Sequence, residues 1–266
     1  MLHAPVFVAG LVMAAAGLAQ AQSWQLVWSD EFNGSIGPNW VFETGAGGWG
    51  NNEWEYYTNS PLNACLNGEG SLVITARAAT PAQQQTLPCW YGQCRYTSAR
   101  LLTRNRFEMT YGKAEACLKI PYGQGIWPAF WMLGANMHDI GWPACGEIDI
   151  MELLGQQVNK VYGTIHWGSS TNTYRKKEGN FVLASGGFDE EFHVYSLIWT
   201  ADDIKILVDD QQYFQALKAE ITDPNPFNSE FFFLFNIAVG GNWPGAPDNT
   251  TVFPQRMFVD YIRVFQ

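Results

Sequence analysis

Short runs of apolar and aromatic residues, separated by Gly, Pro and Asn, recur along most of the chain. The runs have strand length, and no long stretch repeats with a helical period, although residues 211–220 are ambiguous. Asp209-Asp210 predicts a hairpin turn between 204–208 and 212–214. Many strands at regular spacing predict one antiparallel β-sandwich, in which the first and last strands can pair. The clearest predicted strands are 25–28, 71–76, 114–120, 193–199, 204–209, 231–237 and 257–264.

The segment 146–152 (GEIDIME) places three carboxylates among apolar residues. In a regular strand, Glu147 and Asp149 share one face and Glu152 lies on the other. A β-bulge near Ile150-Met151 turns all three acids to one side. Like charges this close raise at least one pKa, because the three groups cannot all ionise freely. An ionised carboxylate beside a protonated acid is the pair that cleaves a glycosidic bond.

The same pattern also fits the solvated face of an edge strand. The flanking sequence favours a sugar cleft, since an indole offers a flat apolar surface to a pyranose ring while carboxylates bind its hydroxyl groups. The flanking tryptophans are Trp127, Trp131 and Trp142 upstream and Trp167 downstream. Trp127 and Trp131 are four residues apart, so they share a face in a strand. Core packing is the alternative for each of them.

Residues 1–21 form an apolar stretch without Asp, Glu, Lys or Arg that ends in Ala19-Gln20-Ala21. Two small residues separated by one other residue are typical of the cleavage site of a secretory signal peptide. A membrane anchor is the alternative, but the apolar run is short and lacks flanking basic residues. We therefore expect a secreted, extracellular protein whose mature domain is 22–266, with no membrane attachment after cleavage.

The net charge of −10 argues against nucleic acid and anionic polysaccharides as ligands, since both favour basic grooves. Only 15% of residues are charged while 15% are aromatic, a composition typical of carbohydrate-active β proteins. A neutral polymer is the expected substrate.

Five cysteines are present, which leaves at least one without an intramolecular partner. Cys89 and Cys94 flank a tight segment and could close a small disulfide loop in an oxidising compartment. The connectivity does not follow from the sequence, and no cysteine–histidine cluster indicates zinc.

The chain closely resembles the laminarinase (endo-β-1,3-glucanase) branch of glycoside hydrolase family 16, and the resemblance covers essentially all of residues 22–266. Six ordered motifs carry it, without departure at the catalytic positions, whereas the Cys89–Cys94 segment is less typical of the family. The motifs are 28–32 (WSDEF), 49–53 (WGNNE), 125–133 (GIWPAFWML), 142–152 (WPACGEIDIME), 236–245 (NIAVGGNWPG) and 259–264 (VDYIRV).

This resemblance implies an all-β jelly-roll sandwich of two curved antiparallel sheets, concanavalin A-like, with a concave substrate cleft. It also implies a retaining double displacement in which Glu147 is the nucleophile and Glu152 the acid/base. Asp149 is expected to hydrogen-bond the nucleophile. Retention requires the two glutamate carboxyls about 5–5.5 Å apart, and a bulged strand allows them to lean together over that distance.

The resemblance further implies cleft positions for six residues and a calcium site away from the cleft. The expected substrate-binding residues are Asn51, Trp127, Trp131, Trp142, His166 and Trp243, with His166 near the acid/base. Glu31, Gly70 and Asp260 match a structural Ca²⁺ site that some members have, the glycine through its carbonyl oxygen. Catalysis itself is expected to require no cofactor.

The expected activity is hydrolysis of internal β-1,3-glucosidic bonds by a monomer. A mixed-linkage β-1,3-1,4-glucanase is the nearest alternative, although that branch generally lacks the bulge. A carrageenase would need a basic cleft. A non-catalytic β-glucan recognition protein is the alternative from another class, but such proteins lose the catalytic glutamates, which this chain keeps.

Overall fold

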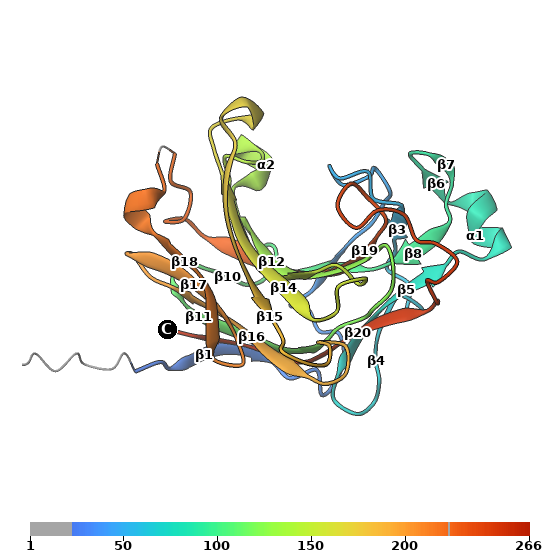
Figure 1. Cartoon of the computed structure of the whole chain (residues 1–266), viewed down its shortest axis with the longest axis horizontal. Helices are drawn as coiled ribbons and strands as arrows, with labels where there is room; N and C mark the ends of the chain where they lie inside the picture. The colour runs from blue at the N-terminus through green and yellow to red at the C-terminus, as the bar shows by residue number, and fades with distance from the viewer. Residues whose placement is uncertain (1–22, 223) are drawn as a thin grey trace, which may run out of the picture.

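Two large β-sheets pack face to face and form most of the molecule (Figure 1). The structure is a computed structural model that describes residues 23–222 and 224–266, so the predicted signal peptide at 1–21 lies outside the described residues. Every pairing between the strands is antiparallel except the one between the third and eighth strands. The predicted antiparallel sandwich is therefore confirmed.

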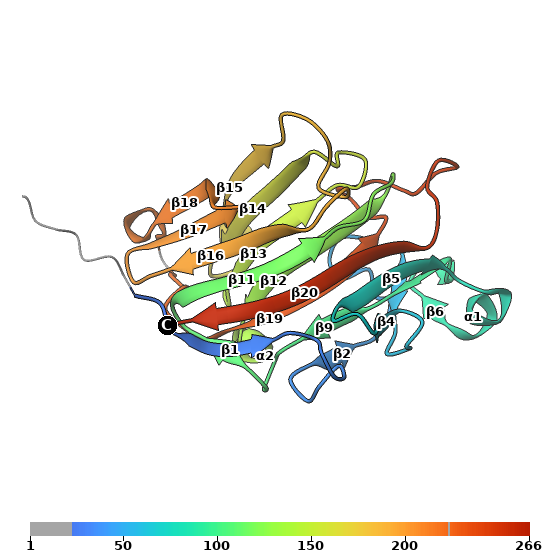
Figure 2. The same cartoon turned by 90° about the horizontal axis from the view of Figure 1, so that it is seen from below.

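The outer layer is a ten-stranded sheet, seen from below in Figure 2. Its order is β18-β17-β16-β11-β20-β5-β8-β3, with β1 also paired to β20 and β4 to β5. The pairing of the first and last strands is confirmed by contacts such as Asp30 opposite Ile262. The strands are β1 (Leu26–Asp30), β3 (Glu55–Tyr57), β4 (Ala64–Leu66), β5 (Leu72–Ala78), β8 (Tyr96–Ser98), β11 (Gly112–Lys119), β16 (His193–Trp199), β17 (Asp203–Val208), β18 (Gln211–Leu217) and β20 (Gln255–Phe265).

The inner layer is an eight-stranded sheet in the order β15-β14-β13-β12-β19-β9-β2, with β10 paired to β19. The face of this sheet that points away from the ten-stranded sheet opens at the top of Figure 1. The strands are β2 (Val41–Glu43), β9 (Arg100–Leu102), β10 (Glu108–Met109), β12 (Ile126–Gly134), β13 (Glu147–Leu153), β14 (Lys160–Trp167), β15 (Arg175–Val182) and β19 (Phe231–Val239).

Helical structure in the described residues is limited to short segments: α1 (Pro81–Thr86), α2 (Met137–Ile140), η1 (Thr171–Thr173) and η2 (Lys218–Glu220). The ambiguous segment 211–220 is thus strand β18 followed by η2. Asp209 and Asp210 both have positive φ, as a tight turn between β17 and β18 requires, which confirms the predicted hairpin. None of the described helices combines the length and the apolar character needed to cross a bilayer.

A small hairpin of β6 (Pro88–Cys89) and β7 (Gly92–Gln93) follows α1. The predicted disulfide between Cys89 and Cys94 closes it and is confirmed. Trp90 donates its indole N–H to the carbonyl oxygen of Glu53 at 2.7 Å, and the Tyr91 hydroxyl donates to that of Trp54 at 2.5 Å. The hairpin therefore stabilises residues 49–57 through these two hydrogen bonds.

The core lies between the two sheets because residues of alternate parity on each strand point inward. β11 shows the pattern plainly, with every second residue buried. Phe130 stacks on Phe235 with ring centroids 4.8 Å apart, which joins β12 to β19. Trp167 also belongs to the core and packs against Phe227, so it does not flank a sugar site as its sequence position suggested.

A β-bulge interrupts β13 at the predicted place. Asp149 lies opposite Thr164 and Glu152 opposite Tyr162, so two residues of β13 face the single residue Gly163. Those two residues, Ile150 and Met151, are both fully buried in the core. The bulge is therefore confirmed, and it returns Glu152 to the same face as Asp149.

The bulge has its own support from the core. The carbonyl oxygen of Ile150 accepts a hydrogen bond from the hydroxyl of Tyr213 on β18 at 2.6 Å. A Cβ atom at Gly163 would lie 2.9 Å from both Ile206 and Tyr213 side-chain atoms, so only glycine leaves room for the tyrosine to approach. Tyr213 thus satisfies a backbone acceptor that the irregular ladder leaves free.

We expect Tyr213→Phe to lower the free energy of unfolding by about 1–3 kcal/mol, because the buried Ile150 carbonyl loses its donor. Chemical denaturation monitored by tryptophan fluorescence measures this loss. Tyr195→Phe is the matched control, since the Tyr195 hydroxyl is buried and has no hydrogen-bond partner among the described residues. Equal losses in the two variants would show that Tyr213 contributes only packing.

Candidate active site

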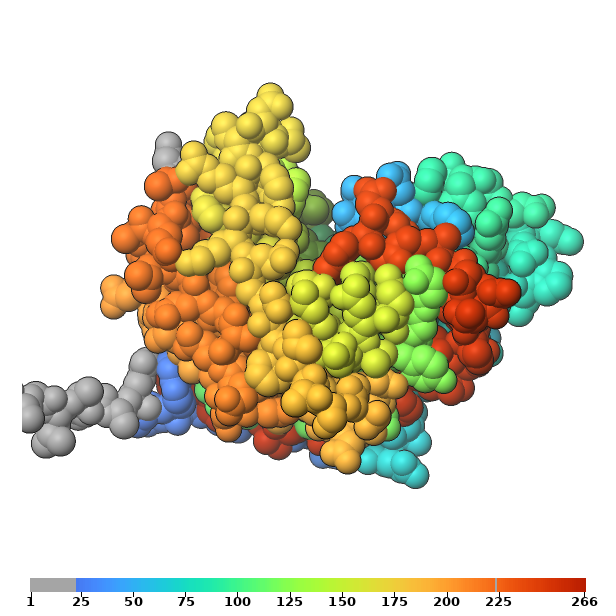
Figure 3. Space-filling view, in the orientation of Figure 1, coloured from blue at the N-terminus to red at the C-terminus, as the bar shows by residue number. Residues whose placement is uncertain are grey.

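A cleft of about 560 Å³ lies on the outward face of the eight-stranded sheet. In the space-filling view, the surface is hollowed between the yellow segment on one side and the blue and red segments on the other (Figure 3). The cleft brings together every residue that the sequence predicted for catalysis and substrate binding. These residues are Asn51, Trp127, Trp131, Trp142, Glu147, Asp149, Glu152, His166 and Trp243.

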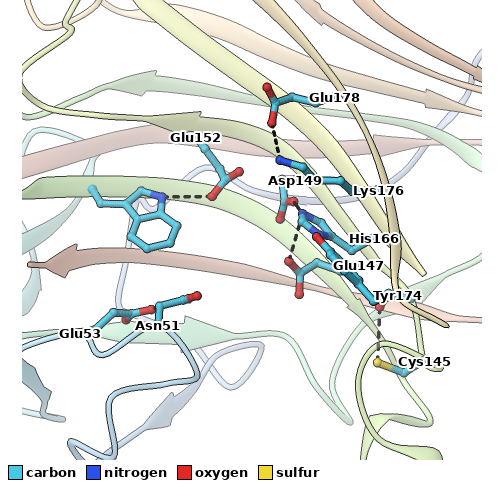
Figure 4. A network of polar contacts seen from close by, with 12 residues as sticks. Asn51, Glu53, Cys145, Glu147, Asp149, Glu152, His166, Tyr174, Lys176 and Glu178 are labelled. Atoms are coloured by element: carbon cyan, nitrogen blue, oxygen red, sulfur yellow. Dashed lines mark hydrogen bonds and ion pairs between the residues drawn. The ribbon is translucent and has the colours of Figure 1, made fainter. Parts of the chain in front are cut away.

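The three acids of β13 point into this cleft from one strand (Figure 4). Asp149 is the most deeply placed, with its residue only 3% exposed. Burial raises the pKa of each of the three carboxyl groups, since it disfavours the charged form. Repulsion from Asp149 adds to the rise for Glu147 and for Glu152. The cluster therefore holds protons that isolated carboxyls would lose.

The pKa values of the two glutamates, Glu147 and Glu152, are raised to different extents. Burial and the neighbouring Asp149 raise the pKa of Glu147 to about 7, while His166, Arg100 and Trp142 oppose the rise. The pKa of Glu152 lies well above its ordinary value, because it is buried and feels both Asp149 and Glu147. On raising the pH, Glu147 thus loses its proton before Glu152, the order needed for a nucleophile and an acid.

His166 on β14 contacts the acids from the neighbouring strand. Its Nε2 lies 2.9 Å from an Asp149 oxygen and 3.7 Å from a Glu147 oxygen, and its Nδ1 lies 2.7 Å from the Tyr174 hydroxyl. The ring thus contacts Asp149 through Nε2 and Tyr174 through Nδ1. His166 therefore sits against Asp149 and Glu147 more closely than against Glu152.

Within the described part of the chain, Glu147, Asp149 and His166 lie close enough together to hold a metal ion, with one ligand atom of each within 4.8 Å of the others. Within this group, His166 Nε2 already contacts an Asp149 oxygen directly, at 2.9 Å.

Aromatic side chains form both walls of the cleft. On one side, Trp127 donates its indole N–H to Glu152 at 3.0 Å and meets the edge of Trp243 at a centroid distance of 5.2 Å. On the other side, Trp142 packs against Tyr174 at 5.1 Å. Trp142 and Trp243 remain 41% and 38% exposed, so their faces are open to a ligand. Such flat apolar surfaces beside hydrogen-bonding groups suit a sugar chain.

Several cleft residues were not predicted from the sequence. Arg100 lies between two cleft tryptophans, 4.9 Å from the Trp49 ring and 4.8 Å from the Trp131 ring, and pairs with Glu43 at 2.7 Å. Nothing in the local sequence marks Arg100, Glu43 or Tyr174 as cleft residues. Asn236 is different, because a lone amide within the apolar run of β19 signals a buried polar contact.

The residues matched to calcium lie outside the cleft lining. Both carboxylate oxygens of Glu31 accept hydrogen bonds from Arg263, at 2.9 and 2.8 Å. Asp260 is exposed, and Gly70 has a φ of +92°. The guanidinium already neutralises Glu31, so the carboxylate of Glu31 does not fit as a free cation ligand, and calcium binding stays a prediction.

A β-sandwich whose bulged strand carries three acids into an aromatic cleft defines a carbohydrate-cleaving class of protein. Comparison with known proteins gives the family: residues 53–263 match the family model described as glycosyl hydrolases family 16. The chain belongs to this family, and its sandwich is the family's jelly roll.

Similar proteins cover nearly the whole chain. The laminarinase catalytic domain from Thermotoga maritima MSB8 is 46% identical, with a TM-score of 0.83, over 92% of this chain and 99% of that chain. The β-glucanase of Rhodothermus marinus is 37% identical over 93% of this chain and 87% of its own length. The clotting factor G alpha subunit of Tachypleus tridentatus is 40% identical over 91% of this chain, which spans only 34% of that protein.

Two indole N–H groups each stabilise the ionised form of one glutamate, Trp142 that of Glu147 and Trp127 that of Glu152. Removing either N–H raises the pKa of its glutamate. If Glu147 acts ionised, Trp142→Phe moves the acidic limb of the kcat/KM profile to higher pH. If Glu152 acts protonated, Trp127→Phe moves the alkaline limb to higher pH.

Profiles of kcat/KM against pH for the two variants and the unaltered protein measure these shifts. Each variant serves as the control for the other, since both keep an aromatic ring in the cleft. A shift of the acidic limb in Trp127→Phe would reverse the assignment of the two glutamates.

Proposed function

We propose that the protein is a retaining endo-β-1,3-glucanase that hydrolyses internal bonds of laminarin-like glucans. The observation that carries the proposal is the placement of Glu147, Asp149 and Glu152 on one face of bulged β13, inside an aromatic-lined cleft. Similarity to the Thermotoga laminarinase domain supports the β-1,3 linkage.

In the first step, the Glu147 carboxylate attacks the anomeric carbon, and the bond to the leaving glycosidic oxygen breaks. Glu152 gives its proton to that oxygen, and a covalent glycosyl-enzyme forms. In the second step, water attacks the anomeric carbon while the ionised Glu152 accepts its proton and Glu147 leaves. Asp149, which contacts His166 at 2.9 Å, lies between the two glutamates on the same face of β13 and raises the pKa of both.

The acidic surface and the aromatic walls support a neutral glucan as the partner, with no nucleic acid. A binding-only role is the alternative from another class, and the intact acid cluster with its raised pKa values argues against it. We propose a monomer that is secreted and extracellular. The Cys89–Cys94 disulfide supports secretion, since such bonds persist in oxidising compartments.

We expect the protein to release a ladder of β-1,3 oligosaccharides from laminarin, and Glu152→Gln to release none, because the leaving oxygen then receives no proton. Product chromatography on laminarin, curdlan and lichenan measures this. Glu178→Gln, which removes a charge at the cleft margin while leaving the three acids in place, is the control for folding and charge.

Cleavage of lichenan with laminarin untouched would instead assign the mixed-linkage activity. Binding to glucan without any released reducing ends from the folded, unaltered protein would assign a recognition protein.

We also propose, from the family resemblance, a structural Ca²⁺ at Glu31, Gly70 and Asp260. Because the Glu31 carboxylate already holds Arg263, binding requires a rearrangement of that pair. Calcium at 100 times its Kd would add about 2.7 kcal/mol of stability, and the melting temperature would fall on chelation. Asp260→Asn should abolish the response. An unchanged melting temperature after chelation would contradict the site.

A further inference from the structure

Two glutamates lie on the buried face of the 53–57 segment, beside the cleft but apart from the three acids of β13. Glu53, Glu55 and Tyr57 are spaced by two residues, so in the extended chain they point to the same side. Glu55 is 0% exposed and Glu53 5% exposed. Buried acids need hydrogen-bond partners or protons, and the hydrolytic mechanism uses neither of these two.

Glu53 is the end point of hydrogen bonds that begin at cleft side chains. Its Oε1 accepts from the Asn51 amide at 2.9 Å, and its Oε2 accepts from the Tyr57 hydroxyl at 3.3 Å. Tyr57 in turn accepts from the Asn236 amide at 3.0 Å. The Asn236 oxygen accepts from the indole N–H of Trp131 at 2.7 Å.

Every donor in this chain of contacts points toward Glu53. Two donors converge on its two oxygens, which an ionised carboxylate accepts and a protonated one accepts less well. The direction therefore requires Glu53 to be charged. Asn51 and Trp131, at the far ends, both line the cleft.

Glu55, in contrast, keeps its proton, so the two glutamates together carry one negative charge. Its Oε2 accepts the backbone N–H of Val239 at 2.7 Å, while its Oε1 has no hydrogen-bond partner among the described residues, so no donor there stabilises the ionised form. Complete burial and the Glu53 charge raise the pKa of Glu55 well above its ordinary value. Burial also raises the pKa of Glu53, but the bonds from Asn51 and Glu55 and the charge of Arg100 oppose the rise.

Few charged groups face this pair. Arg100 attracts Glu53 and is itself paired with Glu43. Tyr57 and Tyr91 are the titratable hydroxyls that feel Glu55, and burial raises the pKa of both. Arg95 lies beside Tyr91 at the outer face of the segment. One positive charge thus serves Glu43 and Glu53 together, which leaves none for an ionised Glu55.

We propose that Glu53, next to a protonated Glu55, positions Asn51 and, through Tyr57 and Asn236, Trp131 for binding of the glucan; we call this series of hydrogen bonds the relay. The inference rests on the proposed function, because it assigns positioning residues to that reaction. Loss of the Glu55 proton adds a second buried negative charge beside Glu53, and the hydrogen bonds of the relay then lose their order. Substrate binding weakens, while the acids of β13 continue to act on the substrate that is bound.

The test compares KM and kcat on laminarin for the unaltered protein, Tyr57→Phe and Glu53→Gln. Tyr57→Phe removes one hydroxyl and cuts the relay to Asn236, whereas Glu53→Gln replaces an acceptor oxygen with an amide that cannot accept. We expect KM to rise about tenfold in each, with kcat within about twofold, because lost ground-state contacts to a charged group act on binding. Glu115→Gln on β11 is the matched control.

Glu55→Gln supplies a second readout, since glutamine has the shape of the protonated acid but cannot lose a proton. KM of the unaltered protein should rise at alkaline pH, and in Glu55→Gln this rise should disappear. The alkaline fall of kcat, which follows Glu152, should stay in place.

Absence of hydrolysis by the unaltered protein would refute the proposed function. Hydrolysis with the same KM in Tyr57→Phe as in the unaltered protein would overturn the positioning relay alone, as would a fall in kcat at constant KM. If Glu53→Gln fails to fold, Tyr57→Phe and the pH profile of Glu55→Gln still decide the question.

Discussion

The extra residue in β13 is the constraint on which the active site depends. A regular strand would send Glu152 into the core, where an unpaired carboxyl costs several kcal/mol. The bulge instead places two apolar residues, Ile150 and Met151, in succession on the core side. Glu152 then joins Asp149 above the sheet. The same local irregularity therefore adds two adjacent apolar side chains to the core and a third acid to the cleft.

The third acid brings electrostatic repulsion into the cleft, and side chains of the neighbouring strands contact the acids there. Three carboxyls from one strand repel one another, and burial deepens the repulsion. Two polar groups from outside β13 reach the acids: the indole N–H of Trp127 on β12 donates to Glu152, and the ring of His166 on β14 contacts Asp149. Each group approaches a different acid, so the acids have unlike surroundings although they come from one strand. The difference in protonation that glycosidic cleavage requires follows mainly from the acids themselves, because Asp149 and Glu147 both raise the pKa of Glu152, whereas Arg100 and Trp142 oppose the rise at Glu147.

The sequence was most informative where the relevant physics is local. Strand alternation, the Asp209-Asp210 turn and the bulge follow from a few consecutive residues, and all three are present. Parity along a strand also explains the error over Trp167. It follows His166 directly and must point to the opposite face, into the core.

Residues assembled by distant pairing were beyond such reasoning. Arg100 reaches the cleft because β9 pairs with β19, and its partner Glu43 comes from β2 on its other side. Likewise, Arg263 holds the Glu31 carboxylate only because β20 lies beside β1. The sheet order decides these contacts, and strand propensity carries no information about that order.

The order of the strands in the chain differs from their order in space. β19 lies between β12 and β9 in the middle of the inner sheet, and β20 lies between β11 and β5 in the middle of the outer one. Both are formed by residues 231–265, after nearly all other strands have been made. During synthesis, the strands that flank β19 and β20 therefore keep unpaired edges until residues 231–265 have been made. The sandwich closes only when this late segment inserts into both layers, so the loss of β20 would divide the outer sheet between β11 and β5.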